Sequence, residues 1–75
     1  MKKQHYKIEC ATIKTTIEAI NPQEAFVIAV RQAKFPDLSP LFRFKNLEKK
    51  HRPENLWHYQ DTEEVLSKYG LLVNL

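Results

Sequence analysis

Glycine is scarce in this chain, with one residue in 75, whereas average proteins contain about 7 %. Loops that cradle phosphate need several glycines, because their backbone approaches the ligand where a Cβ would clash. The composition therefore excludes a glycine-rich nucleotide-binding loop. The one glycine, Gly70, follows a short apolar stretch in a position where a left-handed residue ends a helix, and we expect it to do so.

Cysteine and long apolar runs are also in short supply. Cys10 is the only cysteine, so no intramolecular disulfide can form, and this absence favours a reducing, cytoplasmic compartment over secretion. The longest uninterrupted apolar run, from Ala25 to Val30, is much shorter than a membrane-spanning helix requires. No apolar segment follows the basic N-terminus as it would in a signal peptide. We therefore expect no membrane partner.

The residue patterns of catalytic and metal sites are missing as well. The candidate metal ligands show none of the paired spacings of zinc sites; they are His5, Cys10, His51 and His58. Cys10 falls among alternating apolar residues, where a thiol behaves as a small apolar side chain. Neither serine lies in a nucleophile-elbow context. We expect no catalytic residues, no enzyme activity, no metal and no cofactor.

Two stretches near the N-terminus alternate between apolar and polar residues, with opposite parity. Residues 5–11 carry apolar side chains at even positions, and residues 12–20 carry them mostly at odd positions. An antiparallel hairpin that pairs Cys10 with Ile13 places all of them on one face. Because Ala11-Thr12 lacks the Asn-Gly or Asp-Gly of tight hairpins, a four-residue loop and a single bulged strand stay open as alternatives.

A helix is predicted to follow, since Asn21, Pro22 and Glu24 occupy cap, first-turn and capping-box positions. It should end before Phe35, because Pro36 disfavours helical geometry in the residue ahead of it. Two apolar residues of this helix, Val27 and Ile28, lie outside its apolar stripe. They either pack in a wide contact with the sheet or form an exposed patch for a partner.

The second half of the chain predicts two more strands and another helix. Residues 41–47 place Phe42 and Phe44 on one face, and residues 56–60 place Trp57 and Tyr59 on one face. Asp61 begins a second capping box. A chain of 75 residues supports one small domain, residues 1–75. We expect an α+β fold of order ββαββα, with an antiparallel sheet covered on one face by the first helix. Residues 71–75 are expected either to dock as a short strand or to pack against the core.

The positive charge is concentrated in one segment. Between Arg43 and Glu54 the chain holds five basic and two acidic residues, a balance of +3, which equals the net charge of the whole chain. Such a surface steers association with an acidic partner. The residues that we expect to contact the partner are the five basic side chains of this segment together with a tryptophan: Arg43, Lys45, Lys49, Lys50, Arg52 and Trp57.

Two functions are compatible with this segment. The first is a non-enzymatic protein-binding module, a small regulator that docks on a larger protein with an acidic surface. The alternative is a domain that binds single-stranded nucleic acid, in which the same charges contact phosphates and aromatic side chains stack on bases; those side chains are Phe42, Phe44, Trp57 and Tyr59. An exposed sheet edge also favours a homodimer.

Residues Tyr6 to Leu47 resemble the strand, strand, capped helix, strand pattern of several small phage and mobile-element proteins. Short phage inhibitors of host RNA polymerase are among them. The resemblance rests on a strand-to-helix junction, Ile17-Glu18-Ala19-Ile20-Asn21-Pro22-Gln23-Glu24-Ala25, which encodes a strand, a cap and a helix and by itself carries no function. The connector from Pro36 to Pro40 and the segment from Trp57 to Leu75 have no counterpart in that pattern. The resemblance implies a regulator of phage type.

Overall fold

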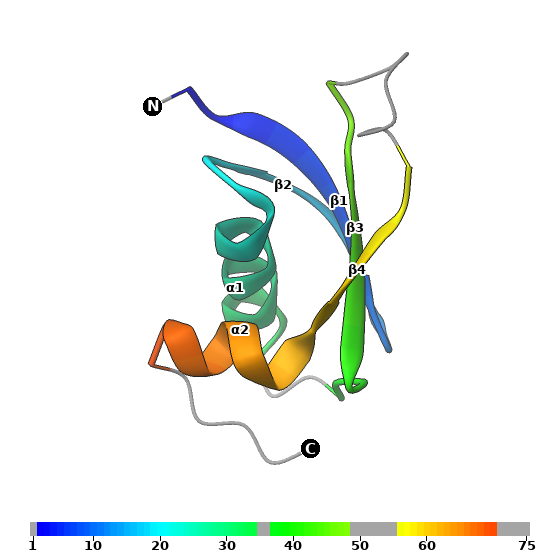
Figure 1. The fold of residues 1–75 in the computed structure, drawn as a ribbon, viewed down its shortest axis with the longest axis vertical. Helices are drawn as coiled ribbons and strands as arrows, with labels where there is room; N and C mark the ends of the chain where they lie inside the picture. The colour runs from blue at the N-terminus through cyan, green and yellow to red at the C-terminus, as the bar shows by residue number, and fades with distance from the viewer. Residues whose placement is uncertain (1, 35–36, 49–55, 71–75) are drawn as a thin grey trace.

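The computed structural model describes residues 2–34, 37–48 and 56–70, and these form an antiparallel sheet with two helices, an α+β fold of order ββαββα as expected (Figure 1). The strands are β1 (Gln4–Cys10), β2 (Ile13–Ala19), β3 (Leu41–Asn46) and β4 (His58–Asp61). The helices are α1 (Pro22–Ala33) and α2 (Thr62–Lys68). Residues 71–75, for which the sequence left open a short strand or packing against the core, lie outside the described residues.

The strand order in the sheet is β2-β1-β3-β4, so β1 and β3 are the central strands and β2 and β4 are the edges. The predicted hairpin is confirmed: Cys10 pairs with Ile13, Ile8 with Thr15, and the register continues without interruption to Gln4. The turn contains only Ala11 and Thr12. Ala11 takes a positive φ of 52°, a conformation that favours glycine at the first position of a type II′ turn.

Both helices begin at the predicted caps. Asn21 accepts a hydrogen bond from the backbone N–H of Glu24 at 2.7 Å, and Asp61 accepts one from that of Glu64 at 2.9 Å. Each bond satisfies an N–H that has no partner within its own helix. α1 ends at Ala33, ahead of the Phe35-Pro36 pair. Gly70 follows α2 with φ +75° and donates its N–H to the carbonyl of Ser67, so it ends the helix as expected.

The two helices lie on the same side of the sheet, and the core fills the space between these layers (Figure 1). The rings of Phe26 on α1 and Phe42 on β3 stack with their centroids 3.8 Å apart. Val27 is buried, so the interpretation of this residue as part of an exposed patch is wrong, and Ile28 is half-buried against the core. Two residues of α2 join the same core, Val65 and Leu66.

The described helices are short. None of them is both long and apolar enough to cross a membrane.

Candidate functional site

The face of the sheet opposite the helices carries polar and charged side chains on its two central strands. The register places Lys7 opposite Lys45 and Glu9 opposite Arg43. Because successive side chains of a strand point to opposite faces, these four share the face that neither helix covers, while Ile8 and Phe44 share the face under α1.

Trp57, just before β4, is surrounded by three cations on this open face. From the centroid of its ring, the Arg43 guanidinium carbon lies 4.1 Å away, the Lys45 Nζ 4.9 Å away and the Lys7 Nζ 5.8 Å away. Cations are attracted to the face of an aromatic ring at such distances. The half-buried indole therefore holds three positive groups from β1 and β3 close to one another.

Arg43 also binds Glu9 across the two central strands. Its Nε donates to Glu9 Oε1 at 2.9 Å, and its Nη2 donates to the same oxygen. The hydrogen bond from Arg43 lowers the pKa of Glu9, and the interactions with Glu9 and then Tyr59 raise the pKa of Arg43. Glu9 thus offsets one of the three charges near Trp57, whereas Lys7 and Lys45 form no ion pair with any carboxylate in the described part of the chain.

The pairing of Lys7 with Lys45 is unfavourable for the isolated sheet. Like charges directly opposite each other on neighbouring strands destabilise a sheet, whereas opposite charges such as Glu9 and Arg43 stabilise it. The indole ring offsets part of this repulsion. An anionic group placed between the two ammonium groups would offset the rest of this repulsion.

A shallow hollow of about 320 Å³ adjoins this cationic group at the end of the sheet nearest the β1–β2 turn. Leu41 and Tyr59, which help to line it, are 51 % and 62 % exposed. Glu9 and Arg43 line it as well. We call the apolar and cationic residues that lie exposed or half-buried on this side the docking face: Lys7, Leu41, Arg43, Lys45, Trp57 and Tyr59.

The structure brings together three of the six residues that the sequence assigned to the partner, namely Arg43, Lys45 and Trp57. The other three lie outside the described residues: Lys49, Lys50 and Arg52. The sequence assignment missed Lys7, although its outward parity in β1 was visible in the alternating pattern. What that pattern did not show is that β1 is a central strand beside β3.

The four aromatic residues proposed as one stacking platform are divided between the two faces. Phe42 is 1 % exposed and stacks on Phe26 beneath α1. Phe44 lies on that same side, half-buried, with its ring 5.4 Å from that of His58. Only Trp57 and Tyr59 belong to the open face. A platform of all four rings is therefore wrong, because the pairing of β3 with β4 places the two pairs on opposite faces.

Cys10 is buried in the core and its thiol lies within 3.9 Å of polar atoms of Ser39, Leu41 and Thr62. Among residues 2–34, 37–48 and 56–70, no three histidine, cysteine, aspartate or glutamate side chains lie close enough together to hold a metal ion. The expectations of no enzyme and no cofactor stay predictions.

No protein-family model, no curated protein and no solved structure matches the chain. Functional assignment therefore depends on the chemistry of the docking face.

Proposed function

We propose that this protein is a non-enzymatic protein-binding module that docks on a larger protein through the docking face. The partner surface carries carboxylates, which bind between Lys7 and Lys45, and an apolar side chain, which enters the hollow beside Tyr59. Docking of this kind suits a small regulator of phage type that acts by covering part of its target. The one cysteine in the chain is buried and not part of a disulfide, in keeping with a cytoplasmic site of action.

The observation that supports a protein partner most strongly is the exposure of Leu41 and Tyr59 beside Arg43. Tryptophan, tyrosine and arginine dominate the binding energy of protein interfaces, where apolar side chains bury their surface and carboxylates bind at the cationic positions. A leucine 51 % exposed on the binding face has apolar surface to bury against a protein, whereas contacts with phosphate and sugar are mainly polar or ionic.

The proposal is tested by capture from the native host with chemical cross-linking and quantitative mass spectrometry. The docking-face variant combines Lys45→Glu with Tyr59→Ala. The matched control makes the same chemical changes on the helix side, Arg31→Glu with Tyr69→Ala, at exposed positions of α1 and of the α2 end. We expect a specific protein to be captured by the wild-type chain and the control but lost with the docking-face variant. If the variant captures the same proteins as the control, the proposal is wrong.

Fluorescence anisotropy with labelled single-stranded DNA and RNA oligonucleotides tests the alternative function. Electrostatic binding of an oligonucleotide should weaken steeply between about 50 and 200 mM salt. If such binding is observed and the variant Trp57→Ala loses it, the proposed function becomes nucleic-acid binding in place of protein binding. Trp57 is the decisive position because, of the four aromatic residues, only it and Tyr59 are available on the open face for base stacking.

A further inference from the structure

Among residues 2–34, 37–48 and 56–70, β2 lies at the edge of the sheet and is hydrogen-bonded to β1 alone. It spans seven residues and contains neither proline nor glycine. Its pairing with β1 runs without a bulge from Ile13 to Ala19. A long, regular edge strand is a template for another strand, because its outward N–H and C=O groups lack partners in the sheet.

The hairpin geometry indicates which backbone groups point outward. In a hairpin with a two-residue turn, the residues that flank the turn exchange both backbone hydrogen bonds, and here these are Cys10 and Ile13. Hydrogen-bonded and non-hydrogen-bonded pairs then alternate along an antiparallel ladder. Lys14, Thr16 and Glu18 therefore direct their N–H and C=O groups away from β1, towards the free edge.

We propose that β2 pairs antiparallel with β2 of a second copy, around a two-fold axis at Thr16. In this register the outward backbone groups of Thr16 bind those of Thr16 in the other copy, and Lys14 of each copy lies opposite Glu18 of the other. Two pairs of opposite charges form on the same face, each of a kind that stabilises neighbouring strands. A two-fold interface needs such a self-complementary strand.

The charges also select this register over its neighbours. A shift of the axis by two residues towards the N-terminus places Lys14 opposite Lys14, and the same shift towards the C-terminus places Glu18 opposite Glu18. Shifts by one residue leave both charges opposite uncharged residues, Thr12, Thr16 or Ile20. Pairing at Thr16 alone combines full overlap of the strands with opposite charges at both ends.

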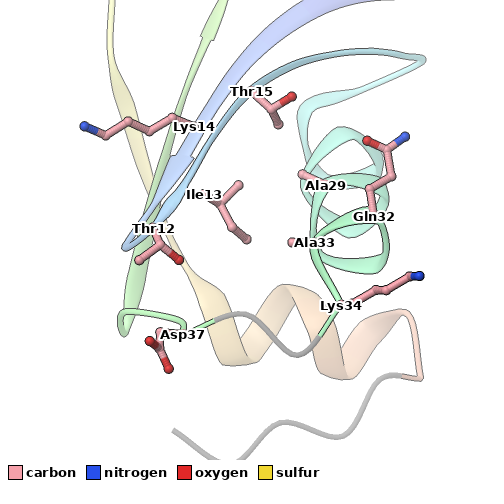
Figure 2. Close-up of a pocket in the computed structure, with 9 residues that line it drawn as sticks. All are labelled: Thr12, Ile13, Lys14, Thr15, Ala29, Gln32, Ala33, Lys34 and Asp37. Carbon is pink, nitrogen blue, oxygen red and sulfur yellow. The ribbon is translucent and has the colours of Figure 1, made fainter.

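The helix layer leaves this edge accessible where β2 begins. Figure 2 shows a cleft between residues 12–15 of the hairpin and the last turns of α1, with Thr15 on one side and Gln32 on the other. Its volume is about 510 Å³, and small side chains, Ala29 and Ala33, form part of its lining. On the helix-covered face of the sheet, the proposed register places Ile17 of the second copy opposite Thr15. The cleft beside Thr15 therefore leaves space for the side chain of that Ile17.

Sedimentation equilibrium over a range of concentrations tests the proposal first with Thr16→Pro. The proline removes an N–H that points to the free edge and leaves the bonds between β2 and β1 in place. We expect the wild-type chain to approach twice its mass of 8.9 kDa as its concentration rises, Thr16→Val to behave alike because it keeps the N–H, and Thr16→Pro to stay monomeric. A wild-type chain that is monomeric at all concentrations, or a dimer that Thr16→Pro leaves intact, overturns the proposal.

A charge exchange tests the register and controls for folding. Lys14→Glu leaves two negative positions on the strand and Glu18→Lys leaves two positive ones, so each variant alone should be monomeric or at least tenfold weaker in dimerisation. An equimolar mixture should form a heterodimer, because every 14–18 pair is again of opposite charge. Recovery in the mixture also shows that both chains are folded. If the mixture does not associate while the wild-type chain does, this register is wrong. The docking face lies on β1, β3 and the β4 side, so failure of the dimer leaves the proposed function standing.

Discussion

At the scale of single residues, Arg43 has three interactions on the open face. It binds Glu9 on β1, lies over the indole of Trp57, and interacts with Tyr59, which is paired with it on β4. A guanidinium serves such a position better than an ammonium group because its planar donors bind a carboxylate while its face stacks on a ring. Arg43 therefore orients the aromatic part of the docking face as well as contributing charge to it.

The Glu9–Arg43 bond makes stability depend on pH. Because the pKa of Glu9 is lowered in the folded chain, chiefly by its hydrogen bond from Arg43, the unfolded chain binds more protons in the acidic range. The stabilisation is complete above the ordinary carboxyl pKa and is lost as the pH falls through the lowered value. We expect the coupling between Glu9→Gln and Arg43→Gln in a double-mutant cycle to be favourable at pH 7 and to vanish in acid.

Urea unfolding at several pH values between neutrality and about pH 2 measures this coupling. The cycle removes the separate effects of each substitution and isolates the pair. A coupling free energy that stays constant across this range would show that the ionised carboxylate of Glu9 is not what binds Arg43.

At the scale of elements, the β1–β2 turn contains one of the two non-glycine residues with a positive φ in the described part of the chain, the other being Lys34 after α1. Ala11 has φ 52°, and the left-handed region costs a residue with a Cβ about 1–2 kcal/mol. A glycine at this position removes that cost. It also increases the conformational entropy of the unfolded chain, which destabilises the folded state by about 0.4–1 kcal/mol. We therefore expect Ala11→Gly to raise the free energy of unfolding by about 0.5 to 1 kcal/mol, as measured by urea denaturation.

Thr12→Gly is the matched control for the turn. Thr12 has no positive φ, so glycine there brings only the entropy cost and should lower the free energy of unfolding by about 0.5–1 kcal/mol. If both glycine variants destabilise the hairpin alike, the φ of Ala11 carries no strain.

The elements themselves could be predicted from the sequence, because each depends on local patterns. The change of parity between residues 5–11 and 12–20 indicated the hairpin register that the structure has, with a four-residue loop and a bulged strand open as alternatives, and Asn21 and Asp61 marked the helix starts. The faces of β3 and β4 were likewise assigned correctly within each strand. How these faces combine depends on pairing between distant strands, and the pattern of one strand contains no information about that.

The candidate site was accordingly only half predictable. Arg43, Lys45 and Trp57 stand in or next to the basic segment, so composition alone pointed to them. Lys7 lies 36 residues before Arg43 in the chain and reaches the site because β1 inserts between β2 and β3. Val27 was left unassigned for a similar reason: its burial depends on the packing of the complete helix layer, and a single helical stripe does not show that.

At the scale of the whole molecule, the two faces of the sheet differ in the side chains that they carry. The helix side holds the core that stabilises a short chain, with Phe26 and Phe42 stacked at its centre. The open side carries the pair of opposite charges Glu9 and Arg43, of a kind that stabilises a sheet, and the like-charged pair Lys7 and Lys45, of a kind that destabilises it. The proposed dimer would join two sheets edge to edge and keep both docking faces on one side, so that a repetitive partner could bind both at once.

Lys7→Thr separates folding from binding in a single substitution. Threonine removes the repulsion from Lys45 and favours a strand, while the cation that it removes is the most distant of the three from the indole of Trp57, at 5.8 Å. We expect the free energy of unfolding to rise by about 0.5 kcal/mol and capture of the proposed partner protein to fall, because the variant lacks one of the two lysines that we propose to bind its carboxylate. Lys2→Thr, at an exposed position before β1, should change neither quantity. Urea denaturation and quantitative capture from the host measure the two effects, and a variant that loses stability would show that Lys7 serves the fold rather than the partner.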